Sequence, residues 1–145
     1  LDTSRIVVAA QCVGIGQAAL EHAVRYAQQR QTFGKSLSSH QAIQFMLADM
    51  ATSVHASRSI TMEAATLKDS DLPFNNEASM AKLLASEMCE KVTSQAIQVH
   101  GGYGYFKDSP VERLFRDARV TTIYEGTSEI QRLVIARHVL DQYPI

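Results

Sequence analysis

A glutamate lies beside a glycine at the predicted start of a helix, in the run Tyr124-Glu125-Gly126-Thr127. Thr127 offers a hydroxyl cap to that helix, so Glu125 would lie just outside a helix N-terminus. The helix dipole favours an anion there, whereas the apolar flank of Ile123 and Tyr124 would exclude water and disfavour it. A carboxylate held in this way can act as a base on an acidified C–H group. It can equally be a plain capping carboxylate, and the spacing leaves both interpretations open.

Glycines form a second group of residues suited to a binding site. Positive φ and exposed N–H groups are possible at the five that lie outside the long helical patterns, namely Gly34, Gly101, Gly102, Gly104 and Gly126. The run from Gln98 to Tyr105 follows a predicted helix, so it is neither a Rossmann nor a P-loop fingerprint. By itself, such a run more often marks a helix end and a tyrosine-rich turn.

Composition and charge argue against several classes of protein. The chain has 145 residues, of which 46% are hydrophobic and 20% charged, which suits one globular domain. Fourteen basic and fifteen acidic residues give a net charge of -1, so nucleic acid and acidic membranes are not expected partners. The spacing of the histidines predicts no metal site. Cys12 and Cys89 lie far apart in the sequence, which also argues against a metal site, and we expect both thiols to be reduced. The longest apolar run, Ile6 to Ala10, is too short to span a bilayer, and no signal-peptide features precede it, so we do not expect secretion.

Apolar residues repeat at helical spacing along nearly the whole chain. Three long helices are predicted, at about residues 5–30, from residue 43 to a break at 69–76, and at 77–100. Apolar residues on the third helix, Leu84 among them, are expected to face the core. Gly14 and Gly16 within the first helix indicate close approach of another backbone or of a ligand, and tight packing of a neighbouring helix is the more common reason for such glycines.

The C-terminal third of the chain predicts shorter elements. A helix begins at Pro110, where Ser109 and Glu112 form a capping box. Residues 120–124 are either extended or a turn, and a last helix follows Thr127. Five helices without strand pairing predict an all-α, antiparallel four-helix bundle, with the last helices packing alongside to complete the core.

Four segments of the chain together carry a family resemblance. They are Arg30-Gln-Thr-Phe33-Gly34-Lys35, residues 40–50 (HQAIQFMLADM), residues 98–105 (QVHGGYGY) and residues 123–132 (IYEGTSEIQR). In this order they resemble the C-terminal helical domain of the acyl-CoA dehydrogenase flavoenzymes. The resemblance implies that residues 1–145 are the C-terminal bundle domain of a longer flavoenzyme. An N-terminal helical domain and a middle β domain are missing from the sequence, so we expect the isolated chain to bind FAD weakly and to be inactive.

The resemblance also implies an activity, the flavin-dependent α,β-dehydrogenation of an acyl-CoA thioester to the trans-2-enoyl-CoA. Glu125 would remove the α proton while a hydride leaves the β carbon for FAD, and its own backbone N–H would help to polarise the thioester carbonyl. Some relatives carry the base on the first helix, directly before a substrate-binding arginine. Here that position is Ser4, which cannot be the base. The substrate-binding residues implied by the family pattern are Asp2, Arg5 and Gly126.

The cofactor and partners are likewise implied by the resemblance. The FAD-binding positions are Arg30, Phe33, Gln41, Gln98, Gly101, Gly102, Thr127, Ser128 and Glu129. Some of them would reach the flavin of a neighbouring subunit, which implies a homodimer or homotetramer. Electron-transferring flavoprotein would be the electron acceptor. The compartment would be the mitochondrial matrix in a eukaryote or the cytoplasm in a bacterium.

Two other functions compete with this interpretation. An acyl-CoA oxidase would remove the same two hydrogens and pass the electrons to dioxygen. A non-catalytic helical module would keep the bundle for oligomerisation alone. Packing alone requires neither Glu125 nor Arg5 nor the cofactor-like segments, which favours an enzyme.

Overall fold

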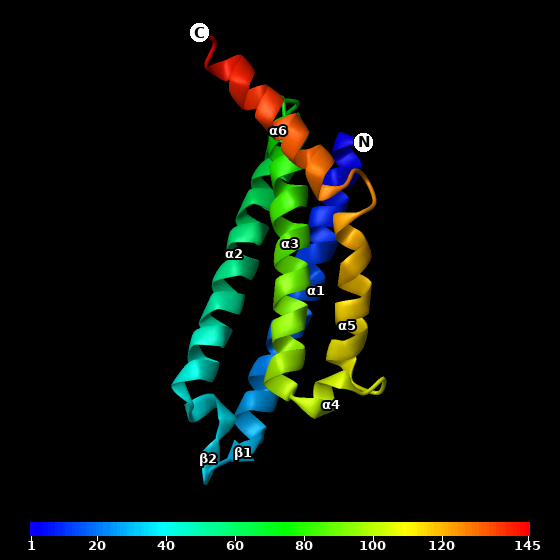
Figure 1. The fold of residues 1–145 in the computed structure, drawn as a ribbon. Helices are drawn as coiled ribbons and strands as arrows, with labels where there is room; N and C mark the ends of the chain where they lie inside the picture. The colour runs from blue at the N-terminus through cyan, green and yellow to red at the C-terminus, as the bar shows by residue number, and fades with distance from the viewer.

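The computed structural model describes residues 1–145 as a bundle of antiparallel helices (Figure 1). The α-helices are α1 (Asp2–Gln29), α2 (Gln41–Asp69), α3 (Asn75–His100), α4 (Gly102–Tyr105), α5 (Pro110–Arg119) and α6 (Ser128–Gln142). Between α1 and α2 lie two short strands, β1 (Gln31–Thr32) and β2 (Lys35–Ser36), and a 3₁₀ turn, η1 (Leu37–Ser39). A second 3₁₀ turn, η2 (Val120–Thr122), follows α5. The predicted all-α bundle is confirmed.

The core forms where α1 and α3 lie against each other, because the residues that face inward are small. Fully buried positions repeat at helical spacing on both helices, as Ala9, Cys12, Ala19, Ala23 and Ala27 on α1 and Ala78, Ala81, Ala85, Cys89 and Ala96 on α3. Small side chains let two helix backbones approach closely. A Cβ at Gly16 would lie 2.7 Å from the Met88 sulfur, which confirms the predicted close packing there, whereas Gly14 has no neighbour within 4 Å.

Helix α1 is long and apolar enough to cross a membrane by length and composition alone. Its small-residue face is buried against α3, however, as in the central helix of a bundle. Cys12 and Cys89 are free thiols buried in this interface. The pKa of the Cys89 thiol is raised because it shares a hydrogen bond with Cys12 and is shielded from water.

The connection between α1 and α2 differs from the prediction of no strand pairing. Strands β1 and β2 form a two-stranded antiparallel hairpin whose turn residues, Phe33 and Gly34, have φ values of 52° and 77°. Positive φ at both turn residues matches the twist of a tight hairpin. Strands of two residues are too short to give an alternating pattern in the sequence.

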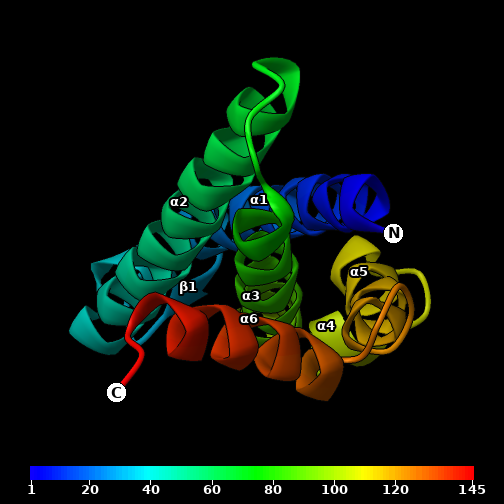
Figure 2. The ribbon, with the colours of Figure 1, turned by 90° about the horizontal axis from the view of Figure 1, so that it is seen from above.

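The structure differs from four further predictions, three of them in the C-terminal part and one on α3. Helix α5 packs alongside the long helices, but α6 crosses the end of α3, and its Leu133 is 54% exposed (Figure 2). The predicted capping box is absent, since the Ser109 side chain makes no capping bond and the Glu112 carboxylate pairs with Arg116 at 2.6 Å. Residues 120–122 form the 3₁₀ turn η2, in agreement with the turn alternative for this segment, whereas α4 adds a sixth helix that was not predicted. On α3, Leu84 is exposed and does not belong to the core.

Lys82 is the largest fully buried side chain of the bundle. Its ammonium group donates a 2.7 Å hydrogen bond to the carbonyl of Gly126, in the connector between η2 and α6. No carboxylate lies within ion-pair distance of it. Burial therefore lowers the pKa of Lys82 below its ordinary value, because the charged form loses its hydration.

The close packing of α4 on α3 can be tested by substitution of Gly104. A Cβ at this position would lie 2.8 Å from the Ile97 carbonyl oxygen and 2.9 Å from the His100 Cβ. We expect Gly104→Ala to lower the free energy of unfolding by about 1–3 kcal/mol, since backbone must move. Gly14→Ala, which meets no atom within 4 Å in mid-helix, should raise it by about 0.5–1 kcal/mol. Urea denaturation measures both, and equal effects would contradict the packing described.

Lys82 should make stability depend on pH. Between its lowered folded-state pKa and the ordinary value of about 10.4, the unfolded chain binds a proton that the folded chain does not. The free energy of unfolding should therefore rise with pH in that window, and this rise should be absent in Lys82→Met. Urea denaturation of both proteins from neutral pH to about pH 10 measures the difference. Parallel curves for the two proteins would show that the buried charge of Lys82 does not lower the stability of the folded state.

Candidate active site

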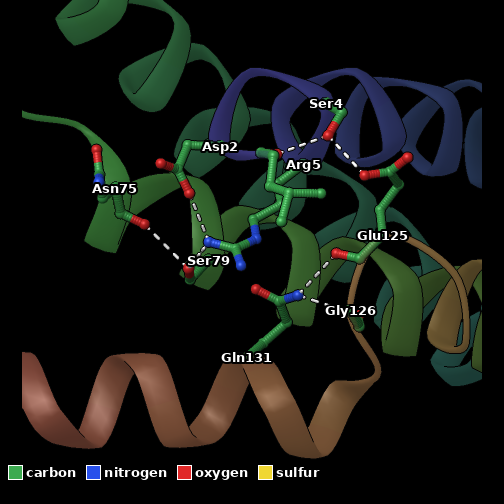
Figure 3. Close-up of polar contacts among 9 residues, drawn as sticks. Asp2, Ser4, Arg5, Asn75, Ser79, Glu125, Gly126 and Gln131 are labelled. Carbon is green, nitrogen blue, oxygen red and sulfur yellow. Dashed lines mark hydrogen bonds and ion pairs between the residues drawn. The ribbon is translucent and has the colours of Figure 1, made fainter.

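All four of the predicted catalytic and substrate-binding residues lie at one end of the bundle (Figure 3). Asp2 and Arg5 come from the first turns of α1, while Glu125 and Gly126 come from the connector between η2 and α6. Helix α3 begins at the same end and contributes Ser79. Contacts between segments more than 70 residues apart therefore build this site.

The backbone turn at Glu125 and Gly126 has an unusual conformation. The φ values of the two residues are 54° and 91°, in the left-handed region that costs a non-glycine residue about 1–3 kcal/mol. Gln131 Nε2 donates to both turn carbonyls, at 3.2 Å to Glu125 and 3.0 Å to Gly126, and Lys82 donates to the second. A Cβ at Gly126 would lie 2.6 Å from Gln131 Nε2, so this position requires glycine.

These two side chains, Lys82 and Gln131, form what we call the carbonyl clamp. The clamp holds the carbonyl groups of Glu125 and Gly126 toward the protein interior. The backbone N–H groups of both residues make no hydrogen bond within the chain. Free N–H groups at such a turn can bind a carbonyl oxygen or an oxyanion.

The Glu125 side chain is half-buried and reaches back to α1. Ser4 Oγ lies 2.7 Å from Glu125 Oε2, while Oε1 has no hydrogen-bond partner in the chain. The alternative of a plain capping carboxylate is wrong, because Thr127 caps α6 by accepting from the Ile130 N–H at 3.4 Å. One oxygen of the carboxylate is thus anchored and the other is available.

Arg5 is an unusual arginine because it is only 8% exposed. One terminal nitrogen, Nη1, donates to Asp2 Oδ1 at 2.6 Å and to Ser79 Oγ at 3.2 Å. Its Nε and the Oε1 atom of Gln131 are buried polar atoms without a partner. Such atoms are costly to leave unpaired, so they are suited to contact polar groups of a ligand.

A second site lies at the opposite end of the bundle. Arg30, Gln98, Gly101 and Gly102 line a cavity of about 560 Å³ together with residues of the hairpin and α4. The Arg30 guanidinium lies 5.8 Å from the centre of the Tyr103 ring and has no carboxylate partner. An unpaired arginine beside glycine backbone suits a phosphate group.

Two other predicted cofactor residues lie near this end but do not line the cavity. Phe33 is 98% exposed at the tip of the hairpin, and Gln41 is exposed at the start of α2. The cavity wall also contains His100, which stacks on Tyr26 with ring centres 4.3 Å apart. Burial lowers the pKa of His100, so a neutral imidazole is favoured there.

The last three predicted cofactor residues, Thr127, Ser128 and Glu129, form the N-terminus of α6. They line a polar cavity of about 270 Å³ with Arg119 and Arg132. The Ser128 hydroxyl is buried there without a hydrogen-bond partner. The pKa of Glu129 is lowered because its carboxylate accepts from its own N–H and from the Thr127 hydroxyl.

The predicted cofactor residues therefore fall into two groups that one chain does not bring together. Ser79 and Gln98 lie nineteen residues apart on α3, which corresponds to about 28 Å of helix. Each group nevertheless suits part of a dinucleotide, since one holds an unpaired arginine and the other an unpartnered buried hydroxyl.

Three residues of the site were missed by reasoning from the sequence. Lys82, Ser79 and Gln131 carry no motif of their own, and only the structure shows them beside the turn and Arg5. The one available signal was the position of Lys82 on the alanine-rich face of α3, where a lysine must be buried. Ser4 was noted as a position that lacks the base, but not as a partner of Glu125.

Comparison with known proteins shows the family of the chain. A family model described as "Acyl-CoA dehydrogenase, C-terminal domain" matches residues 1–140. The chain is 57% identical over 143 residues to the mitochondrial short-chain specific acyl-CoA dehydrogenase of Bos taurus, covering 99% of this chain and 35% of the relative. It is 49% identical over 140 residues to the CarC subunit of the caffeyl-CoA reductase-Etf complex of Acetobacterium woodii, covering 97% and 37%.

A solved structure gives the same result. Butyryl-CoA dehydrogenase from Megasphaera elsdenii superimposes with a TM-score of 0.95 at 47% identity, over 96% of this chain and 36% of that one. The chain thus spans little more than a third of the length of the proteins that it matches. Its sequence, its fold and the match over residues 1–140 place it in the acyl-CoA dehydrogenase family.

Proposed function

We propose that the protein containing this chain is a flavin-dependent acyl-CoA dehydrogenase that converts an acyl-CoA thioester to the trans-2-enoyl-CoA. Glu125 is its base. The observation that carries the proposal is the Glu125–Gly126 turn, whose N–H groups and carboxylate oxygen Oε1 are free at the end of the bundle that also holds Arg5. A catalytic carboxylate and an oxyanion donor are thus supplied by a single residue.

The chemistry of this turn follows from the acidity of the substrate. An α proton of a thioester is too weakly acidic for a carboxylate unless the developing enolate is stabilised. The Glu125 N–H binds the thioester oxygen and stabilises that charge, while Oε1 of the same residue takes the α proton. The carbonyl clamp holds the two peptide groups that follow Glu125 and Gly126, and it thereby restrains the turn that carries the Glu125 N–H before the substrate arrives, which reduces reorganisation during the reaction. Arg5, held by Asp2 and Ser79, contacts the acyl-CoA.

The cofactor is FAD, which accepts the hydride from the β carbon when bound. Thr127, Ser128 and Glu129 contact the cofactor near the base, and Ser128 supplies a hydroxyl that has no partner within the chain. At the other end of the bundle, Arg30, Gln98, Gly101 and Gly102 bind the cofactor of a neighbouring subunit, and Phe33 and Gln41 belong to the same contact. The separation of the two groups along α3 supports a homodimer or homotetramer.

The electron acceptor is electron-transferring flavoprotein. The support comes from the relative in Acetobacterium woodii, which is named as a subunit of a complex that contains Etf. The relatives reported above are named as dehydrogenases or as a reductase, which favours this activity over the oxidase alternative. The left-handed turn favours catalysis over a purely structural module, because packing does not require the strain. The mitochondrial matrix and the bacterial cytoplasm both suit these relatives.

The base is tested by Glu125→Gln in the full-length protein with bound flavin. The amide keeps the shape of the side chain but cannot take a proton, so anaerobic flavin reduction by acyl-CoA should slow by about 10²–10⁴-fold. Glu63→Gln, an exposed carboxylate on α2, is the matched control and should react at the wild-type rate. Stopped-flow absorbance of the flavin measures both. Unchanged reduction in Glu125→Gln would end the assignment of the base.

The isolated 145-residue chain should hold FAD weakly, since the two groups of cofactor residues do not meet on one copy. Purification of the chain alone and a flavin absorbance spectrum test this expectation. Flavin retained in a one-to-one ratio would mean that the chain forms a complete cofactor site without the other segments of its relatives.

A further inference from the structure

The hydroxyl of Ser4 is the one side-chain group within hydrogen-bond distance of the proposed base (Figure 3). Ser4 lies in the first turn of α1, 121 residues before Glu125, and its Oγ is 2.7 Å from Glu125 Oε2. A second acceptor, the Leu1 carbonyl oxygen, lies 2.6 Å from the same Oγ. A serine hydroxyl carries a single proton, so it can donate to only one of these two acceptors at a time.

The ionised carboxylate should receive this proton. A hydrogen bond to a charged acceptor is shorter and about twice as strong as one to a neutral carbonyl. The Leu1 carbonyl does not depend on Ser4, because it also accepts from the Arg5 N–H at 3.1 Å. Once Glu125 has taken a proton, the two acceptors are both neutral, and the Leu1 carbonyl competes on equal terms.

We propose that Ser4 is a positioning residue that keeps the Glu125 carboxylate aimed at the substrate before proton abstraction, by binding Oε2 and leaving Oε1 free. This inference rests on the proposed function. The bond also removes rotamer freedom from a long side chain, so that Oε1 stays directed into the site.

Other charged and titratable groups lie at the same end of the bundle as the carboxylate. They are Asp2 and Arg5 on α1, Lys82 on α3, Tyr124 in the connector and Glu129 on α6. All of them remain in place when the Ser4 hydroxyl alone is removed. A comparison of wild-type and Ser4 variants therefore isolates the contribution of this hydroxyl.

The test is anaerobic flavin reduction by acyl-CoA at one pH over a range of substrate concentrations, in the full-length protein with bound flavin. In Ser4→Ala, the limiting rate of reduction should fall by about tenfold while the substrate concentration at half-maximal rate stays unchanged, because Oε1 is no longer held toward the substrate. Ser4→Gly, which deletes the same hydroxyl, should show the same loss, and Ser4→Thr should restore the wild-type rate. Ser59→Ala is the matched control, since its hydroxyl bonds only a backbone carbonyl, His55 O at 3.1 Å.

The outcomes separate this inference from the proposed function. If wild-type protein reduces its flavin and Ser4→Ala and Ser4→Gly reduce theirs at the wild-type limiting rate, Ser4 does not act on the base. A loss of rate that Ser4→Thr fails to restore also overturns the proposal, because the loss would not depend on the hydroxyl. If the wild-type protein itself shows no flavin reduction with any acyl-CoA, the proposed function is the part that fails.

Discussion

The left-handed turn at Glu125 and Gly126 is the constraint on which the rest of the site depends. Two consecutive residues with positive φ are unfavourable unless the surrounding structure holds them. Lys82 and Gln131 hold this turn by binding its two carbonyl groups, and the glycine leaves room for the Gln131 amide. The N–H groups of both residues and the Oε1 atom of Glu125 make no hydrogen bond within the chain, so they are available to a ligand.

The turn can be held only because the bundle places it beside three helices. The small-residue interface of α1 and α3 brings Ser4 and Arg5 next to Ser79 and Lys82. Helix α6 crosses this end, so that Gln131 in its second turn reaches back to the connector. Burying the Lys82 ammonium without a carboxylate partner costs stability, and its hydrogen bond to Gly126 is the contact that ties it to the site. The buried ammonium thus lowers the stability of the fold, and its hydrogen bond holds the turn in place.

Much of the fold could be predicted from residue patterns, because helical periodicity in α1, α2 and α3 is a local property. The hairpin at Phe33 and the orientation of α6 could not, since two-residue strands have no pattern and exposed Leu133 looks like a core residue in sequence. The family resemblance pointed to Glu125, but not to the hydroxyl of Ser4, 121 residues earlier. Contacts of that range depend on how the helices pack, which local spacing does not encode.

The central claim is that a single residue both binds the thioester oxygen and faces the α carbon. A crystal structure of the full-length protein with flavin and an unreactive acyl-CoA analogue tests it most directly. We expect Glu125 Oε1 within about 3–3.5 Å of the α carbon, and the Glu125 backbone nitrogen within about 2.7–3.1 Å of the thioester oxygen. A thioester bound at the Arg30 end of the bundle, or a Glu125 side chain turned away from the ligand, would contradict this account.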